Sequence, residues 1–179
     1  MGTDEKHDIE SFLTRLGVEH RFVRHAPITS VQEALEKGVP AQLGISLENV
    51  MKNLLVRDFQ HRLFLLVVPG MNRVNLRVLA QELHLSHLSM ARLDEARGLF
   101  GEHKGAVSLF DVLTPKPENV AVTLVVDEGI AQMTGEIAFP AGSDRESVVI
   151  PADRFASVVE EVGAQSGTPT QQVKLPKAE

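Results

Sequence analysis

Apolar residues recur along the chain with two different periods. Residues 9–16 carry them at i, i+3, i+4 and i+7, the spacing of one helix face, and Gly17 follows as a stop signal, so we expect a helix over 9–17. Similar spacing, a capping-box sequence at Ser30 and a proline at 151 predict further helices at 30–37, 76–83, 92–99 and from 151 onward. Alternating or continuous apolar runs predict strands at 20–25, 50–58, 63–68, 120–126 and 147–150.

The order of these elements predicts the fold class. Strands come in adjacent groups separated by short helices, which favours an α+β fold around a mixed sheet. Neither the regular βαβ alternation nor the GxGxxG motif of a dinucleotide-binding fold is present. Residues 38–48 are expected to form a loop and 59–62 a hairpin turn. Residues 1–164 are expected to make a single domain, and 165–179, dominated by Gly, Pro, Gln, Thr and Lys, a flexible C-terminal tail.

Lys52 is the most informative residue of this pattern, because it is a cation inside an apolar strand. Alternation places it on one strand face with Leu54 and Val56, which is the composition of a pocket lining. Removing an ammonium group from water is costly unless a carboxylate, a phosphate or a substrate meets it. The alternative is an edge-strand lysine whose stem lies on apolar surface while its charge reaches water. The pattern alone leaves both interpretations open.

Composition narrows the class of protein. The chain has 179 residues, a formal net charge of −6, eight Phe, and no Tyr, Trp or Cys. The acidic balance argues against DNA as a partner, and aromatic platforms for stacking single-stranded bases are scarce. Without cysteine, disulfides, thiolate metal sites and a cysteine nucleophile are excluded. No signal peptide and no apolar segment of membrane-spanning length are present, so we expect a cytoplasmic protein.

Three other patterns carry weaker signals. His84 and His87 are separated by a strand-like segment and no HExxH motif is present, so we expect no metal site. Ser108 lies outside a GxSxG motif, which argues against a Ser-His-Asp triad. The segment 105–109 begins with glycine, and its N–H groups are candidates to hold an anion or a carbonyl oxygen. Glu146 precedes a strand and is a candidate to point into a cleft.

Taken together, these segments resemble the YbaK/ProX-type aminoacyl-tRNA deacylases, a family that shares its fold with the editing insertion of bacterial prolyl-tRNA synthetases. The resemblance covers about 9–163 and is strongest at 50–58, which is very close to the family's VKNLFLRD segment. Further matches are the strand end His25-Ala26-Pro27, the helix start at 30–34, the strand at 63–68, the turn and helix at 73–80, and the segment 88–91.

The resemblance implies a fold and an activity. The implied fold is a compact mixed β-sheet, almost a barrel, surrounded by helices. The implied activity is trans-editing: hydrolysis of the ester that joins a wrong small amino acid, such as Ala or else Ser or Thr, to a tRNA such as proline tRNA. No cofactor is implied. The implied partner is the 3′ end of aminoacyl-tRNA, with an aminoacyl-tRNA synthetase as a candidate second partner. The charge balance and the lack of a long apolar segment already argue against DNA and a membrane as partners.

The resemblance also implies which residues act. Lys52 falls on the lysine that family members use for deacylation, so it is the expected catalytic residue. Glu146 is a candidate partner for the α-ammonium group of the substrate. The full set of expected substrate-binding residues is Gly105, Ala106, Val107, Ser108, Leu109, Phe139, Gly142 and Glu146.

The chain departs from the family at the pocket. Leu109 stands where the glycine loop usually ends in proline, and Phe139-Pro140 followed by Ser143 stands where alanine-specific members have His-Pro and then Asn. The segment 136–142 resembles instead the EIAFNAG stretch of another branch. Two interpretations follow: a deacylase with altered side-chain selectivity, or a non-catalytic module with a regulatory role that binds aminoacyl-tRNA or a nucleotide ligand in the same pocket.

Overall fold

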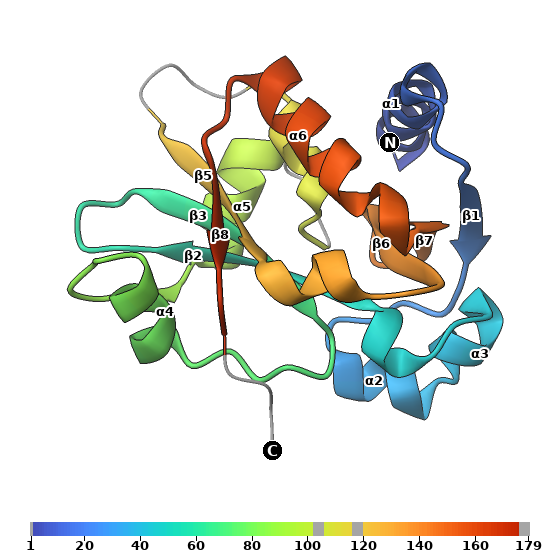
Figure 1. Ribbon diagram of the computed structural model, residues 1–179, viewed down its shortest axis with the longest axis horizontal. Coiled ribbons are helices and arrows are strands. Elements are labelled where there is room, and N and C mark those ends of the chain that lie inside the picture. Colours follow the sequence, from blue (N-terminus) through green and yellow to red (C-terminus); the bar gives the residue numbers. More distant parts are fainter. Residues whose placement is uncertain (1, 102–105, 116–119, 176–179) are drawn as a thin grey trace.

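The structure of the chain is a computed structural model that describes residues 2–101, 106–115 and 120–175 (Figure 1). The α-helices are α1 (Gly2–Leu16), α2 (Val31–Glu36), α3 (Val39–Leu43), α4 (Leu76–Glu82), α5 (Leu93–Phe100) and α6 (Phe155–Ser166). The strands are β1 (Arg21–Arg24), β2 (Met51–Arg57), β3 (Leu63–Pro69), β4 (Ser89–Met90), β5 (Val122–Asp127), β6 (Glu136–Ser143), β7 (Glu146–Pro151) and β8 (Thr170–Val173). Short 3₁₀ turns are η1 (Leu47–Asn49), η2 (Leu109–Leu113), η3 (Glu128–Gln132) and η4 (Ala152–Arg154).

The described strands form two open sheets. One has three strands in the order β1-β7-β6, and the other has five in the order β4-β2-β3-β5-β8. In the larger sheet β2 is antiparallel to β3, whereas β5 and β8 run parallel to their neighbours, so the sheet is mixed. A single parallel bridge, Val50 to Ala138, links the start of β2 to β6. The α+β fold class is therefore confirmed, but the sheets meet at one corner and do not close into a barrel.

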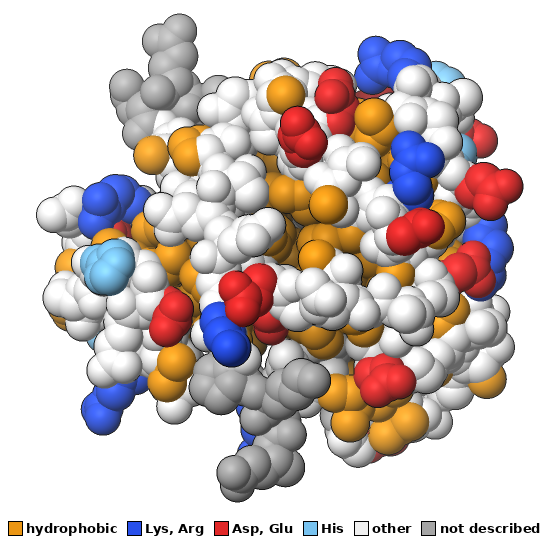
Figure 2. Space-filling model, in the orientation of Figure 1, with side chains coloured by type: hydrophobic (Ala, Val, Ile, Leu, Met, Phe, Trp, Pro, Cys, Tyr) orange, Lys and Arg blue, Asp and Glu red, His pale blue; other side chains and the backbone are white. Residues whose placement is uncertain are grey.

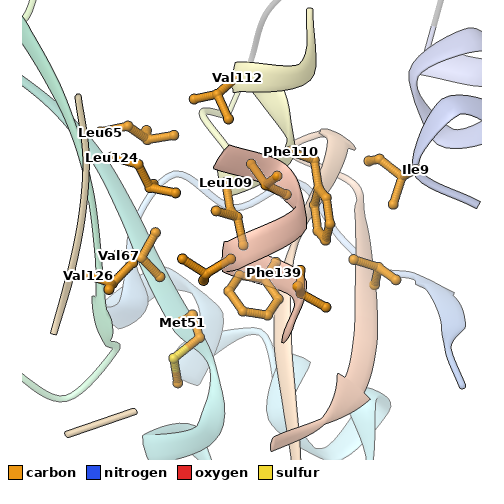
Figure 3. Close-up of a cluster of buried hydrophobic side chains, with 14 of the residues drawn as sticks. Ile9, Met51, Leu65, Val67, Leu109, Phe110, Val112, Leu124, Val126 and Phe139 are labelled. Carbon is orange, nitrogen blue, oxygen red and sulfur yellow. The ribbon is translucent and has the colours of Figure 1, made fainter. Parts of the chain in front are cut away.

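One apolar core fills the space between the two sheets. Leu65 and Val67 of β3 point toward Phe139 of β6 and Phe110 of η2 (Figure 3). The ring of Phe139 lies edge-on to Phe110 with centroids 6.0 Å apart and is stacked on Phe155 of α6 at 5.9 Å. Helices α1, α5 and α6 contribute their apolar faces to this core, and α4 covers the opposite face of the larger sheet.

The strongest sequence patterns are confirmed. β2 and β3 form the predicted hairpin, with Leu63 to Val68 buried at the centre of the sheet. The Ser30 side chain accepts the N–H of Glu33 at the start of α2, which confirms the predicted N-cap. The reciprocal bond of the predicted capping box is shifted by one residue, because the Glu33 carboxylate accepts the N–H of Thr29 and not that of Ser30. Pro151, however, ends β7, and α6 starts only at Phe155 after the 3₁₀ turn η4.

Two predictions about irregular segments are wrong or incomplete. Residues 38–48, predicted to be a loop, contain α3 and the start of η1. Gly38 and Gly44 bracket α3 with left-handed backbone (φ 67° and 72°), so the helix is too short to show a helical period in sequence. β6 was not predicted as a strand, because Pro140 lies within it. It tolerates the proline as an edge strand with an irregular register between Pro140 and Ser143.

The predicted C-terminal tail is also wrong for the described residues beyond 164. α6 continues to Ser166, and β8 then pairs in parallel with β5, with Val126 opposite Gln172. Val173 and Leu175 are buried against α4 and the larger sheet. The polar side chains of β8 hide this strand from a hydrophobicity pattern, because its pairing depends on backbone groups. Among the described residues, no helix combines the length and apolarity needed to cross a membrane.

The packing of β8 predicts a stability difference between neighbours on one strand. Val173→Ala removes two methyl groups from a site that is only 3% exposed, so we expect a loss of about 2 kcal/mol in the free energy of unfolding. Gln172→Ala, at an exposed position of the same strand, should change it by less than about 0.5 kcal/mol. Urea denaturation of both variants measures the difference, and equal effects would contradict the packed strand.

Candidate active site

A cleft of about 540 Å³ lies where the two sheets meet. Its walls come from segments far apart in sequence: the segment between β1 and α2 with the start of α2, residues 50–55 at the start of β2, residues 90–93, Ala106 and Val107, and the β6–β7 hairpin. Most of this lining is apolar, and its ionisable members are His25, Lys52, Arg92, Asp144 and Glu146. An apolar cleft with a few convergent charged groups is the usual composition of a small-ligand site.

The cleft exists because β2 has a free edge. β3 pairs with β2 along its whole length, from Met51 to Arg57, but β4 pairs with it only at Val56 and Arg57. One further backbone bond, from Ala91 to the carbonyl of Leu55, ends the contact on that side. Residues 51–55 therefore all border the cleft, whichever face their side chains occupy. The predicted alternation holds, but the strand edge, and not one strand face, forms the wall.

Lys52 lies on this edge, partly buried. Its Nζ donates to the backbone oxygen of Asn72 at 2.7 Å. Burial lowers the pKa of Lys52 from its ordinary value, and the positive charge of Arg73 lowers it further. No carboxylate pairs with the ammonium group among its recorded contacts in the described chain. A cation that is partly desolvated and held only by a neutral carbonyl is well suited to receive an anionic or polarised oxygen of a substrate.

The turn after β3 places the Asn72 carbonyl. The N–H of Gly70 donates to the Val50 oxygen at 2.8 Å, and a Cβ at position 70 would collide with that same oxygen, so only glycine fits there. The Asn72 side chain in turn donates to the buried carboxylate of Asp127 at 3.3 Å. The turn that orients Lys52 is thus fixed to both β2 and β5.

The glycine-led loop is only partly placed in the cleft. Gly105 lies outside the described residues, whereas Ala106 and Val107 line the wall as expected. Ser108 and Leu109 are fully buried and are not part of the lining, so their contact with substrate stays a prediction that the cleft does not support. The N–H of Ser108 donates to Asp111 at 2.7 Å, and the N–H of Leu109 donates to the side chain of Asn53 at 2.8 Å. These N–H groups are therefore occupied and cannot form the predicted oxyanion site.

Of the two residues expected at the far wall, Phe139 and Gly142, only Phe139 lines the cleft. Phe139 lines the cleft, although the exposed fraction of the residue is only 1%. Gly142 is buried at a left-handed φ of 87° beside the irregular end of β6 and is not part of the lining, so its contact with substrate stays a prediction without support from the cleft. Its conformation serves the turn into β7.

Glu146 also lines the cleft, and its exposed fraction is 8%. Its carboxylate already holds an ammonium group, because the Nζ of Lys6 on α1 donates to Oε1 at 2.7 Å. The same Nζ lies 4.9 Å from the centroid of the Phe22 ring. Lys6 is not itself part of the cleft lining, so it reaches Glu146 from the side of α1.

Sequence reasoning missed His25, Ser147 and Asn53 as cleft residues. His25 follows β1, and its ring contacts Ser147 on β7 at 2.8 Å, a pairing of residues 122 apart in sequence that no local pattern predicts. Asn53 faces the core and is bonded to the Leu109 N–H, and a polar residue in an apolar strand was the available signal. In the described part of the chain, no three His, Asp or Glu side chains are grouped so that they could hold a metal ion.

Comparison with known proteins gives a consistent result. Residues 25–158 match the profile of the aminoacyl-tRNA editing domain, a range that includes Lys52, Phe139 and Glu146. The chain is 28% identical over 167 residues to the prolyl-tRNA editing protein ProX of Acetoanaerobium sticklandii. The matched region covers 91% of this chain and 95% of that protein.

Two solved structures share the fold. One is a candidate trans-editing enzyme for prolyl-tRNA synthetase, with a TM-score of 0.63 at 18% identity, covering 96% of this chain and 98% of that one. The other is a hypothetical protein, with a TM-score of 0.62 at 21% identity, covering 92% and 97%. At these identities the structural likeness establishes the fold alone.

The buried charge of Lys52 predicts how stability depends on pH. In the unfolded chain lysine titrates near 10.5, and in the fold its pKa is lower. Below the folded pKa the charge is carried in both states and the desolvation cost is fully present; as pH rises toward 10.5 the folded state loses its proton first and the cost is relieved. We therefore expect Lys52→Met to be at least as stable as the wild type at pH 7 and to lose that advantage toward pH 10.

Chemical denaturation at both pH values measures this effect. Lys174→Met, which removes an exposed lysine outside this cleft, should show no such pH dependence. A large loss of stability in Lys52→Met at pH 7 would mean that the bond to the Asn72 carbonyl outweighs the cost of burial.

Proposed function

The chain belongs to the family of aminoacyl-tRNA editing domains, and from that premise we propose that it removes a small, wrongly attached amino acid from tRNA in trans, with Lys52 as the catalytic cation. The reaction, deacylation of aminoacyl-tRNA, comes with family membership. The observation that carries the assignment to this cleft is Lys52 itself: a partly desolvated ammonium group without a carboxylate partner among its recorded contacts, on the wall of an apolar cleft.

The chemistry asks little of the protein beyond placement. An aminoacyl ester is already activated, so hydrolysis requires that water, or the neighbouring ribose hydroxyl, be held against its carbonyl carbon. Lys52 would hold the terminal phosphate or ribose and polarise the ester. An ammonium group in a cleft that excludes much of the water stabilises a developing negative charge more strongly than it would in bulk water.

Selection among amino acids would be steric. The wall formed by Phe139, Ala106 and Val107 is apolar, and such a wall discriminates by roughly 1–3 kcal/mol for each methylene group. We therefore expect a preference for small side chains such as Ala, with leakage to Ser or Thr. Phe139 occupies the position where alanine-specific members carry histidine, but it is locked between the rings of Phe110 and Phe155. Its replacement by histidine would disturb the core as well as the selectivity.

Glu146 would bind the α-ammonium group that every free aminoacyl ester carries. The supporting observation is that an ammonium group, that of Lys6, is already bonded to this carboxylate at 2.7 Å. The substrate would take the place of Lys6, whose side chain is 37% exposed and is free to turn to water once it is displaced.

Binding of tRNA is expected to be weak without assistance. The net charge is −6, and on the face shown in Figure 2 acidic and basic side chains are interspersed and form no continuous basic patch. Arg21, Arg57 and Arg92 are each paired with a carboxylate. A synthetase that presents the acceptor end would compensate for this weakness, and such a partner would place the protein in the cytoplasm with the charged tRNA pool.

The proposed function is tested with a panel of alanyl-, seryl-, threonyl- and cysteinyl-tRNA. We expect hydrolysis of one or two of the smaller species, a loss of about 100-fold or more in Lys52→Met because Lys52 stabilises the transition state, and no loss in Lys174→Met. Release of the labelled amino acid over time measures each rate. If the folded wild type hydrolysed none of these substrates, the proposed deacylase activity would be contradicted and a binding module would be favoured.

The role of Glu146 predicts a selective defect. Glu146→Gln should raise KM for aminoacyl-tRNA by about tenfold, since a hydrogen bond to a charged group contributes about 1.5–3 kcal/mol before solvent exposure reduces it. It should leave hydrolysis of N-acetyl-aminoacyl-tRNA unchanged, because that substrate lacks the ammonium group. Glu136→Gln, which removes an exposed carboxylate outside the cleft, is the matched control. Equal defects on both substrates would assign Glu146 to the fold instead.

A further inference from the structure

Two side chains of the cleft form a hydrogen-bonded pair that has no role in the proposed binding and polarisation of the ester. His25 follows β1 and Ser147 lies near the start of β7, and both line the cleft that contains Lys52. The Nε2 atom of His25 lies 2.8 Å from the Oγ of Ser147, and its Nδ1 lies 2.8 Å from the backbone oxygen of Ala26.

These contacts fix the direction of every hydrogen bond in the pair. A carbonyl oxygen can only accept, so Nδ1 carries a proton and donates it to Ala26. In the neutral ring Nε2 then has no proton and accepts the hydroxyl proton of Ser147. This is the polarity of the Ser-His portion of a Ser-His-Asp triad, with a backbone carbonyl in the place of the aspartate. The Ser147 oxygen keeps two lone pairs that can accept a proton from a further molecule.

The backbone around the pair is held rigidly. The N–H of His25 donates to the Arg145 oxygen at 2.9 Å, just after the last paired residue of β1. Ser147 lies on the central strand of its sheet, opposite Val23 on one side and Pro140 on the other. Its exposed fraction is 7%. A pair held by strand pairing on both sides keeps its geometry without substrate, which is the condition for efficient proton transfer.

Three of the four remaining ionisable groups of the cleft are held by other contacts, and the fourth, Asp144, has only a distant ion pair within the described chain. Arg92 is paired with Asp94 and Glu146 with Lys6, while Lys52 can only donate. Asp144 lies 4.0 Å from the guanidinium of Arg145. Imidazole is the side chain that takes up and releases protons most readily near neutral pH, and His25 is the imidazole that lines this cleft within the described chain.

We propose that Ser147 and His25 form a proton relay that activates the water attacking the aminoacyl ester. This inference rests on the proposed function. Water donates its proton to the Ser147 oxygen as the Ser147 hydroxyl proton passes to His25 Nε2, and the water oxygen bonds to the ester carbonyl carbon. The bond from that carbon to the ribose oxygen then breaks, and the proton on Nε2 returns through Ser147 to the departing oxygen. Free amino acid and tRNA result, and no covalent enzyme intermediate forms.

The test compares His25→Asn with His20→Asn. An asparagine amide at position 25 can keep the bond to the Ala26 oxygen but lacks the Nε2 acceptor. His20 makes the same kind of bond, from Nδ1 to the Val18 oxygen at 2.9 Å, but it does not line the cleft. We expect kcat to fall about 100-fold or more in His25→Asn, with KM for aminoacyl-tRNA nearly unchanged, and we expect wild-type kinetics in His20→Asn.

Two further readouts separate a relay from a structural contact. Added imidazole should restore part of the kcat of His25→Asn, and the acid limb of the wild-type kcat–pH profile should be absent in that variant. The charges of Asp144, Glu146, Lys52 and Arg92 also face this cleft, so the comparison is made between variants at each pH. Ser147→Ala, a smaller change on the central strand, should lower kcat to a similar extent with its thermal unfolding midpoint retained.

The outcomes are distinct. Wild-type kcat in His25→Asn or in Ser147→Ala would overturn the relay while leaving the deacylase intact. Labelled amino acid bound covalently to Ser147 after an acid quench would overturn it as well, because the serine would then be the nucleophile. If neither the folded wild type nor Lys52→Met hydrolysed any aminoacyl-tRNA, both the proposed function and the relay would be contradicted.

Discussion

The arrangement of this molecule depends on a strand that is paired fully on one side and only partly on the other. β2 is joined to β3 over all seven of its residues, but β4 covers only Val56 and Arg57 of its opposite edge. The uncovered part of that edge would expose backbone groups and apolar side chains together. The protein surrounds it with the segment between β1 and α2, the start of α2 and the β6–β7 hairpin, and the space left between these segments is the cleft. The position of Lys52 follows from this incomplete pairing.

Much of this could be predicted from sequence, because the decisive signals are local. A cation in an apolar run identified Lys52, continuous apolar residues identified β3, and a capping box identified the start of α2. Two strands that sequence patterns did not predict, β8 and β6, lack such local signals. β8 is polar and depends on backbone pairing with β5, while β6 contains a proline that only an edge strand tolerates.

The site was less predictable than the fold, because tertiary contacts decide which groups are available. Nothing in the sequence around Ser108 and Leu109 reveals that Asp111 and Asn53 occupy their N–H groups. The contact of His25 with Ser147 likewise depends on the register of β1 against β7. A family resemblance transfers a residue's position along the chain, whereas the hydrogen bonds of that residue have to be read from the three-dimensional arrangement.

Phe139 belongs at once to the cleft wall and to the cluster of rings that joins η2, β6 and α6. Any change that reshapes the pocket at this position therefore also removes packing from the centre of the protein. Under the proposed function, side-chain selectivity and thermodynamic stability are therefore inherited together at this site. A lineage that shifts to a different amino acid would first need spare stability, or a compensating change at Phe110 or Phe155. Substrate choice in such a protein is expected to change in rare, coordinated steps instead of drifting one residue at a time.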